Sequence, residues 1–113
     1  MHEMALCESV IEIIEREAQQ QKFSKVRTVW LEIGALSHVE PEALRFCFSA
    51  VSRNTIAAEA RFEIIGVPGE AWCMQCAATV PLAQRYEPCP RCGGHQLQVT
   101  AGEELRVKEL EVD

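Results

Sequence analysis

Four cysteines in two closely spaced pairs constrain this chain more than any other feature of its sequence. The first pair lies in WCMQC and the second in PCPRC, with twelve residues between them. Two Cys-x-x-Cys turns can present four sulfurs at tetrahedral angles, as in zinc sites built on ribbon-like modules. Sulfur would then fill every coordination position, so the predicted zinc is structural and not catalytic. The four predicted Zn(II) ligands are Cys73, Cys76, Cys89 and Cys92.

The same cysteines also allow a redox-active Cys-x-x-Cys pair or two disulfides. A redox pair leaves the second pair unexplained, and disulfides are rare in the cytosol because thiols are kept reduced there. Residues 70–98, which hold the cysteines together with three prolines, are too few to bury much apolar surface. We therefore expect an inserted zinc module whose folding depends on metal binding, which contributes about 10–16 kcal/mol in isolated zinc modules.

The whole composition is that of an ordinary globular protein and excludes several classes of function. Of the 113 residues, 48% are hydrophobic and 25% are charged,. No apolar run approaches the ~20 residues of a membrane span, and no signal peptide is evident, so we expect a cytoplasmic protein without a membrane partner. The net charge of −6 repels phosphate backbones, which disfavours a nucleic-acid adaptor,. No nucleophile–base pair is evident, so we expect no enzyme.

Apolar periodicity outside the cysteine module predicts two helices and three strands. Helical spacing over residues 4–21 and from residue 40 or 41 to about 51 predicts the helices, and alternation predicts strands at 26–34, 61–67 and near 105–112,. The expected fold is α+β, with two helices on a three-stranded sheet formed by residues 1–69 and 99–113. The apolar residues of the last strand change phase between Val107 and Leu110, which predicts a bulge or bend.

Details of the two helices are also predicted. Ser37 and Glu40 resemble a capping box, whereas Pro41 suits the first helical position, so two signals place the start of the second helix differently,. Cys7 and Cys47 lie on apolar stripes, where free cysteine behaves as a small hydrophobe. The stripes comprise Leu6, Cys7, Val10, Ile11, Ile13, Ile14 and Ala18 in the first helix, and Ala43, Leu44, Cys47, Phe48 and Val51 in the second.

A histidine stands at position two, directly before the first helix. The free amine of Met1, the peptide nitrogen of His2 and its imidazole can close adjacent five- and six-membered chelate rings on one ion. Such a planar, nitrogen-rich set suits Ni(II) or Cu(II) and leaves a fourth position open, so that the metal can be passed on. The alternative is a histidine in a frayed terminus.

Three segments, MHEMALC, VWLEIGALSHVEPEALRFCF and WCMQC with CPRC, resemble the HypA/HybF family of hydrogenase nickel-incorporation proteins, and the resemblance runs end to end. It implies a nickel metallochaperone that helps to load Ni(II) into the large subunit of [NiFe]-hydrogenase together with the GTPase HypB. The family's nickel site corresponds to His2, with Glu3 beside it; the Met1 amine is added by the chelate argument above. Its zinc site corresponds to the four cysteines.

Two further histidines and the oligomeric state complete the expectations. His95 lies just beyond the last predicted zinc ligand, and our hypothesis is that it swings toward His2 and completes a nickel square,. The alternative is an exposed histidine in a turn, which is also what we expect of His38. The sequence leaves open whether the protein is a monomer or a homodimer.

Overall fold

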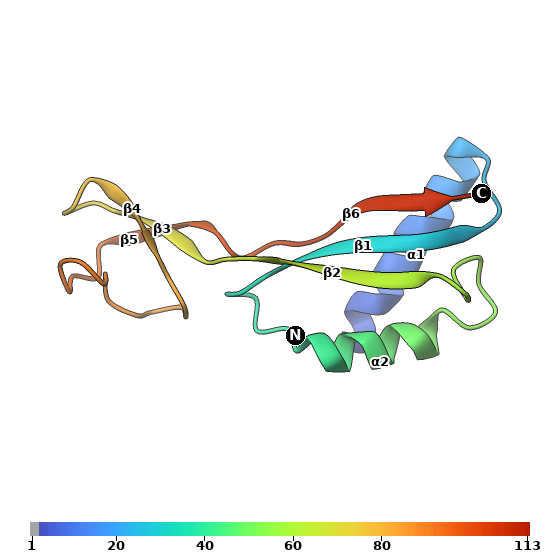
Figure 1. The fold of residues 1–113 in the computed structure, drawn as a ribbon, viewed down its shortest axis with the longest axis horizontal. Coiled ribbons are helices and arrows are strands. Elements are labelled where there is room, and N and C mark those ends of the chain that lie inside the picture. Colours follow the sequence, from blue (N-terminus) through green and yellow to red (C-terminus); the bar gives the residue numbers. More distant parts are fainter. Residues whose placement is uncertain (1–2) are drawn as a thin grey trace. The chain divides into compact units, whose positions relative to one another are not determined.

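A computed structural model describes residues 3–113. The predictions for Met1 and His2 therefore fall outside the described residues. The elements, in chain order, are α1 (Glu3–Gln21), β1 (Val26–Gly34), α2 (Pro41–Val51), β2 (Arg61–Val67), β3 (Glu70–Cys73), β4 (Ala78–Pro81), β5 (Leu97–Ala101) and β6 (Leu105–Val112) (Figure 1). The predicted α+β class, with two helices and a three-stranded sheet outside the cysteine module, is confirmed.

The described residues form two compact units. Unit 1 comprises residues up to 31, 39–65 and 106–113, and unit 2 comprises residues 32–38 and 66–105. The strand order of one sheet is β2-β1-β6, and that of the other is β4-β3-β5. Most of the first sheet belongs to unit 1, and the whole of the second belongs to unit 2.

The core of unit 1 lies between the sheet and its two helices. The helices pack against each other, and α1 crosses behind the strands in Figure 1. The ring of Phe48 in α2 stacks on that of Phe62 in β2 with the centroids 4.3 Å apart. The buried side chains of the helices are Cys7, Val10, Ile11, Ile14, Leu44 and Phe48.

One member of the predicted stripe of α1 is exposed. Ile13 is 39% exposed, so its assignment to the core is wrong. It lies at the border of the stripe, where it lines a groove together with Val107 and Leu110 of β6. Helical periodicity could not show that the sheet ends beside this residue.

The start of α2 decides between the two predicted signals. Pro41 occupies the first turn and Glu40 is the N-cap residue, which confirms the proline signal. The capping-box prediction is wrong, because Ser37 Oγ donates instead to the Gly34 carbonyl at 2.7 Å, in the turn that follows β1. The Glu40 side chain makes no capping bond. Its backbone N–H donates to Glu3 Oε2 at 3.2 Å, so a carboxylate from α1 satisfies one donor at the start of α2,.

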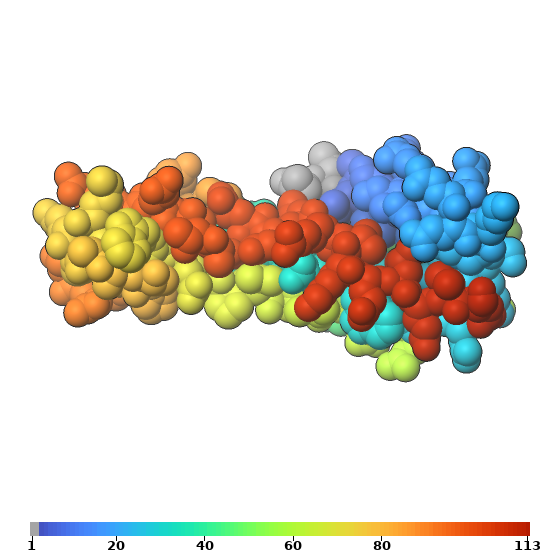
Figure 2. Space-filling view, turned by 90° about the horizontal axis from the view of Figure 1, so that it is seen from above, coloured from blue at the N-terminus to red at the C-terminus, as the bar shows by residue number. Residues whose placement is uncertain are grey.

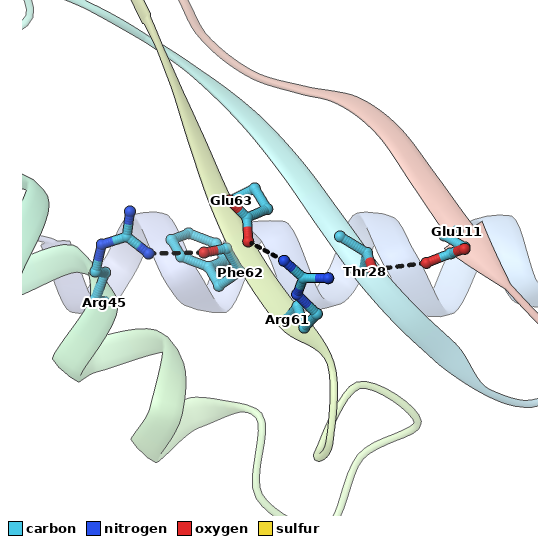
Figure 3. A network of polar contacts seen from close by, with 6 residues as sticks. All are labelled: Thr28, Arg45, Arg61, Phe62, Glu63 and Glu111. Atoms are coloured by element: carbon cyan, nitrogen blue, oxygen red, sulfur yellow. Dashed lines mark hydrogen bonds and ion pairs between the residues drawn. The ribbon is translucent and has the colours of Figure 1, made fainter.

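Polar side chains connect the strands of the first sheet (Figure 3). Thr28 Oγ1 of β1 donates to Glu111 Oε1 of β6 at 2.7 Å, which satisfies a hydroxyl that is only 3% exposed,. Arg61 pairs with Glu63 along β2 at 3.3 Å.

None of the described helices is long and apolar enough to cross a bilayer.

Candidate metal centre

The four predicted zinc ligands lie in unit 2, where two short turns carry them. Cys73 is the last residue of β3, which pairs antiparallel with both neighbours and places Cys73 opposite Ala78 of β4 and Leu97 of β5. The first turn leads from Cys73 to Cys76. The second turn, which holds Cys89 and Cys92, lies between β4 and β5.

The sulfur atoms of all four cysteines lie within 4.8 Å of one another. The Sγ atoms of Cys73 and Cys92 are 3.6 Å apart, and those of Cys76 and Cys89 are 3.9 Å apart. Four sulfurs bound at ~2.3 Å to a tetrahedral ion lie about 3.8 Å from one another. The cluster therefore has the dimensions of a four-sulfur zinc site. Within residues 3–113 it is the only group of three or more such ligands close enough to share an ion.

Backbone N–H groups point at the sulfurs in both turns. The Cys76 N–H donates to Cys73 Sγ at 3.4 Å, and the Arg91 N–H donates to Cys89 Sγ at 3.4 Å. The residue after each second cysteine has a positive φ, 51° at Ala77 and 75° at Gly93. Each turn therefore ends with one left-handed residue, which directs the chain away from the cluster.

These surroundings shift the thiol pKa values in opposite directions. The backbone N–H of Cys92, helped by that of Arg91 and opposed by burial, lowers the pKa of Cys89 to about 6. The hydrogen bond with the Cys92 side chain, followed by burial, raises the pKa of Cys76 to about 12. In the metal-free cluster, Cys89 therefore loses its proton more readily than Cys76 does. A metal ion must displace the proton held at Cys76, because only thiolates ligate it.

The same cysteines supply much of the local core. Cys73, Val80 and Cys89 form a buried cluster with Cys76 and Leu97 packed against it. A second small cluster of Leu36, Ala71 and Leu82 lies in the same unit. Because so few aliphatic side chains are available around the sulfurs, ligation is the main interaction that can hold the two turns together.

Sequence reasoning identified the four cysteines that cluster in the structure but missed the groups that surround them. Gln75 Oε1 lies 3.3 Å from Cys92 Sγ, so the side chain of the first turn reaches the exposed sulfur of the second. The position of Gln75 between Cys73 and Cys76 was the only feature of the sequence that pointed to this contact. The backbone N–H donors at Cys76 and Arg91 depend on the geometry of the turns, which the identities of the residues do not reveal.

The predicted nickel residues are described only in part. Glu3 opens α1, is half-buried and accepts the Glu40 N–H. His95 is exposed between the second cysteine turn and β5, and His38 is exposed with a φ of 62°. Whether His95 approaches His2 stays a prediction, because His2 is outside the described residues.

Comparison with known proteins identifies the family. A sequence model described as "Hydrogenase/urease nickel incorporation, metallochaperone, hypA" matches residues 1–112. The chain is 86% identical to hydrogenase maturation factor HypA of Rhodopseudomonas palustris strain BisA53 and 66% identical to HypA 2 of Bradyrhizobium diazoefficiens, in both cases over 100% of each chain. The solution structure of the Ni metallochaperone HypA from Helicobacter pylori superposes with a TM-score of 0.73 at 24% identity, covering 99% of this chain and 97% of that one. The chain therefore belongs to the HypA family of metallochaperones, which are not catalysts.

Proposed function

We propose that this chain binds Ni(II) at its Met-His-Glu start, through the Met1 amine and the peptide nitrogen and imidazole of His2, with Glu3 beside the ion. It then helps to insert the ion into the large subunit of [NiFe]-hydrogenase during maturation. The family match over residues 1–112, which includes the Met-His-Glu start, carries this proposal. Similar curated proteins are named hydrogenase maturation factors, which supports hydrogenase as the destination.

The four cysteines hold Zn(II) as a structural ion in this proposal. The sulfur spacing and the N–H donors fit a tetrahedral ion, and a full sulfur shell leaves no position for a reacting water,. Residues 70–98 act as the zinc module, and the ion keeps its two turns folded. Nickel is cargo and zinc is resident.

The proposed nickel ligands suit transfer because they are few and exchangeable. A planar set from Met1 and His2 leaves one position at which the acceptor's ligand can enter before the donor's ligands leave. The Glu3 carboxylate bonds the Glu40 N–H, which holds the residue next to His2 against the start of α2. His95 remains our tentative fourth ligand, and its exposure is compatible with that role.

We expect acid to weaken nickel binding. The amine (pKa about 7.7–8.0) and the imidazole (about 6.5) must lose protons before they ligate, so protons compete with the metal as the pH falls through these values. Competition titrations between about pH 8 and about pH 6 should show a falling nickel affinity with unchanged zinc content. A nickel affinity independent of pH would contradict nitrogen ligation.

Hand-over requires protein partners. Membership of the family implies contact with the hydrogenase maturation machinery. We propose the nickel-handling GTPase HypB and the hydrogenase large subunit as the two partners, and the cytoplasm as the place where they meet.

Metal analysis of untagged protein tests the assignment. His2→Ala should lose tight nickel binding while keeping one zinc per chain, because the chelate loses its imidazole and the cysteines are untouched. His38→Ala is the matched control, since it removes an exposed histidine outside the proposed set. His95→Ala tests the fourth ligand by a change in the absorption spectrum of bound Ni(II). Unaltered nickel stoichiometry and affinity in His2→Ala would refute the proposed site.

A further inference from the structure

Cys92 is the exposed member of the four-cysteine cluster. Cys73 and Cys89 are buried, and Cys76 is half-buried. The small core formed by Cys73, Val80 and Cys89 protects its members by packing, and Cys92 is not part of it. A site filled by four sulfurs has no free position, so a competing ligand enters only as one thiolate leaves. Such opening begins most easily at Cys92, unless a neighbouring group holds that sulfur in place.

The side chain of Gln75 is such a neighbour. Gln75 lies in the first cysteine turn, and its Oε1 accepts a hydrogen bond from the Cys92 thiol of the second turn at 3.3 Å. Figure 2 shows the segments that carry the two turns, in yellow and orange, side by side at the surface. The sulfurs of Cys73 and Cys89 accept from backbone N–H groups. At Cys92, by contrast, a side chain from the other turn supplies the contact.

Gly94 makes room for this side chain. A Cβ on Gly94 would lie 2.4 Å from Gln75 Oε1 and 3.5 Å from Cys92 Sγ. The amide of Gln75 therefore lies against Gly94, beside the sulfur, where a larger residue would displace it. The Gly94 carbonyl accepts from the Cys89 N–H at 2.8 Å, which fixes the backbone against which the amide lies.

Metal binding would reverse the direction of this hydrogen bond. A zinc-bound sulfur is a thiolate, which can accept but not donate. The Gln75 amide carries N–H donors next to its oxygen, and half a turn about its terminal bond presents an N–H to the sulfur. Hydrogen bonds to a charged group are stronger than those between neutral groups, and such partners orient the ligands of a metal. The contact with Cys92 is therefore stronger once the sulfur is a ligand.

We propose that Gln75 is a positioning residue whose amide donates to the zinc-bound Cys92 thiolate and slows the opening of the site there, a role that rests on the proposed binding of zinc by the four cysteines. The amide thus gives Cys92 the protection that packing gives Cys73 and Cys89. Donation to the sulfur also withdraws negative charge from it, so an electrophile reacts with it more slowly.

Substitutions of Gln75 separate hydrogen bonding from simple shielding. Gln75→Met keeps the length of the side chain and removes the donor, whereas Gln75→Glu keeps its shape and places a carboxylate beside the thiolate. Groups that orient metal ligands contribute about 10–100-fold to affinity, so zinc should leave about ten-fold faster in Gln75→Met and faster still in Gln75→Glu. Gln75→Lys, which restores a donor, should release zinc no faster than the unaltered protein. Gln98→Met and Gln98→Glu are the matched controls, because Gln98 is exposed in β5 outside the cluster.

Gly94→Ala tests the same contact from the other turn. Its methyl group displaces the Gln75 amide without altering it, so zinc release should accelerate about as much as in Gln75→Met. The double variant Gly94→Ala/Gln75→Met should release zinc no faster than the faster of the two single variants, because both remove one interaction. Gly66→Ala is the matched control, since its methyl group would meet nothing within 4 Å.

Two measurements on zinc-loaded, untagged protein give the readouts. Transfer of zinc to the chromogenic chelator pyridylazoresorcinol gives the rate of release. A limiting amount of iodoacetamide, followed by mass spectrometry of peptides, identifies which cysteine of the cluster reacts first. That cysteine should be Cys92, and its alkylation should accelerate in Gln75→Met. Cys47, which is half-buried and outside the cluster, should react at an unchanged rate and serves as the internal reference.

Zinc content and circular dichroism at the start check that each variant is loaded and folded. Zinc release from Gln75→Met at the unaltered rate overturns the proposal, because the side chain would then act only as a shield. First alkylation at Cys73, Cys76 or Cys89 overturns it as well. If the unaltered protein itself binds no zinc, the proposed metal centre is wrong and the role of Gln75 falls with it.

Discussion

Cys7 shows how its surroundings set the chemistry of a single residue. Its Sγ donates to the Leu44 carbonyl of α2 at 3.4 Å and is fully buried. Burial, with smaller contributions from the charges of Cys47 and Glu3, raises the pKa of the Cys7 thiol to about 12. The prediction that Cys7 is a core residue is confirmed, whereas Cys47 is only half-buried.

This raised pKa predicts a loss of stability in alkali. Between the usual cysteine pKa and about 12, the unfolded chain releases the Cys7 proton and the folded chain retains it,. Folding is then linked to proton uptake, so the contribution of this thiol is complete below the usual pKa and declines as the pH rises. Urea unfolding at about pH 8 to about pH 10.5 should show a steeper loss of stability in the unaltered protein than in Cys7→Ala. Equal slopes would show that Cys7 titrates normally in the folded protein.

At the scale of elements, three glycines allow segments of unit 2 to meet closely. A Cβ on Gly34, at the end of β1, would overlap the carbonyl of Gly102. Gly102 has a φ of 105°, and a Cβ on it would lie 2.6 Å from Gly69 Cα. The Leu36 N–H donates to the Gly102 carbonyl at 2.7 Å, so the contact is also hydrogen-bonded. Side chains are excluded at this crossing because backbone fills the space.

Gly34→Ala should therefore destabilise the protein by about 3 kcal/mol, because the backbone of Gly102 must move to admit a methyl group. Gly66→Ala is the matched control. The same methyl group on Gly66 meets nothing within 4 Å, and the change there should stay within about 1 kcal/mol,. Urea denaturation of both variants measures the difference. Similar losses for the two would mean that the approach at Gly34 is not close in solution.

Local pattern predicted the elements but not their surroundings. The spans of both helices and of β1, β2 and β6 follow from apolar periodicity and from Pro41, which act within a few residues,. The exposure of Ile13 and the bond from the Glu40 N–H to Glu3 depend on residues far apart in the chain. Periodicity describes one element at a time, so it could not predict the contacts between elements.

At the scale of the whole molecule, the two units depend on metal differently. Unit 1 has an aliphatic and aromatic core shared by α1, α2 and β1. In unit 2, three of the four predicted zinc ligands belong to the small buried cluster itself or pack against it. Removing an ion from such a cluster leaves buried thiolates without a partner, which is costly.

Loss of zinc should therefore unfold the region around the cysteines and spare unit 1. In Cys73→Ser, hydrogen exchange should accelerate over β3, β4 and β5 while α1 and α2 keep their protection. Cys47→Ser is the matched control, because it removes a half-buried thiol outside the cluster and should retain zinc and protection. Equal protection of β3 in both variants would contradict a folding role for the metal.

The sequence by itself determined the two cysteine turns, the order of helices and strands, and the resemblance to one family. These features depend on residue types at short spacing, where turn geometry and helical or strand period operate. Only the tertiary structure decided that the four sulfurs lie within 4.8 Å of one another, that β6 forms an edge, and that Glu3 bonds the start of α2. Those outcomes depend on which distant segments pair and pack, because each contact closes a long loop of chain that local preferences do not specify.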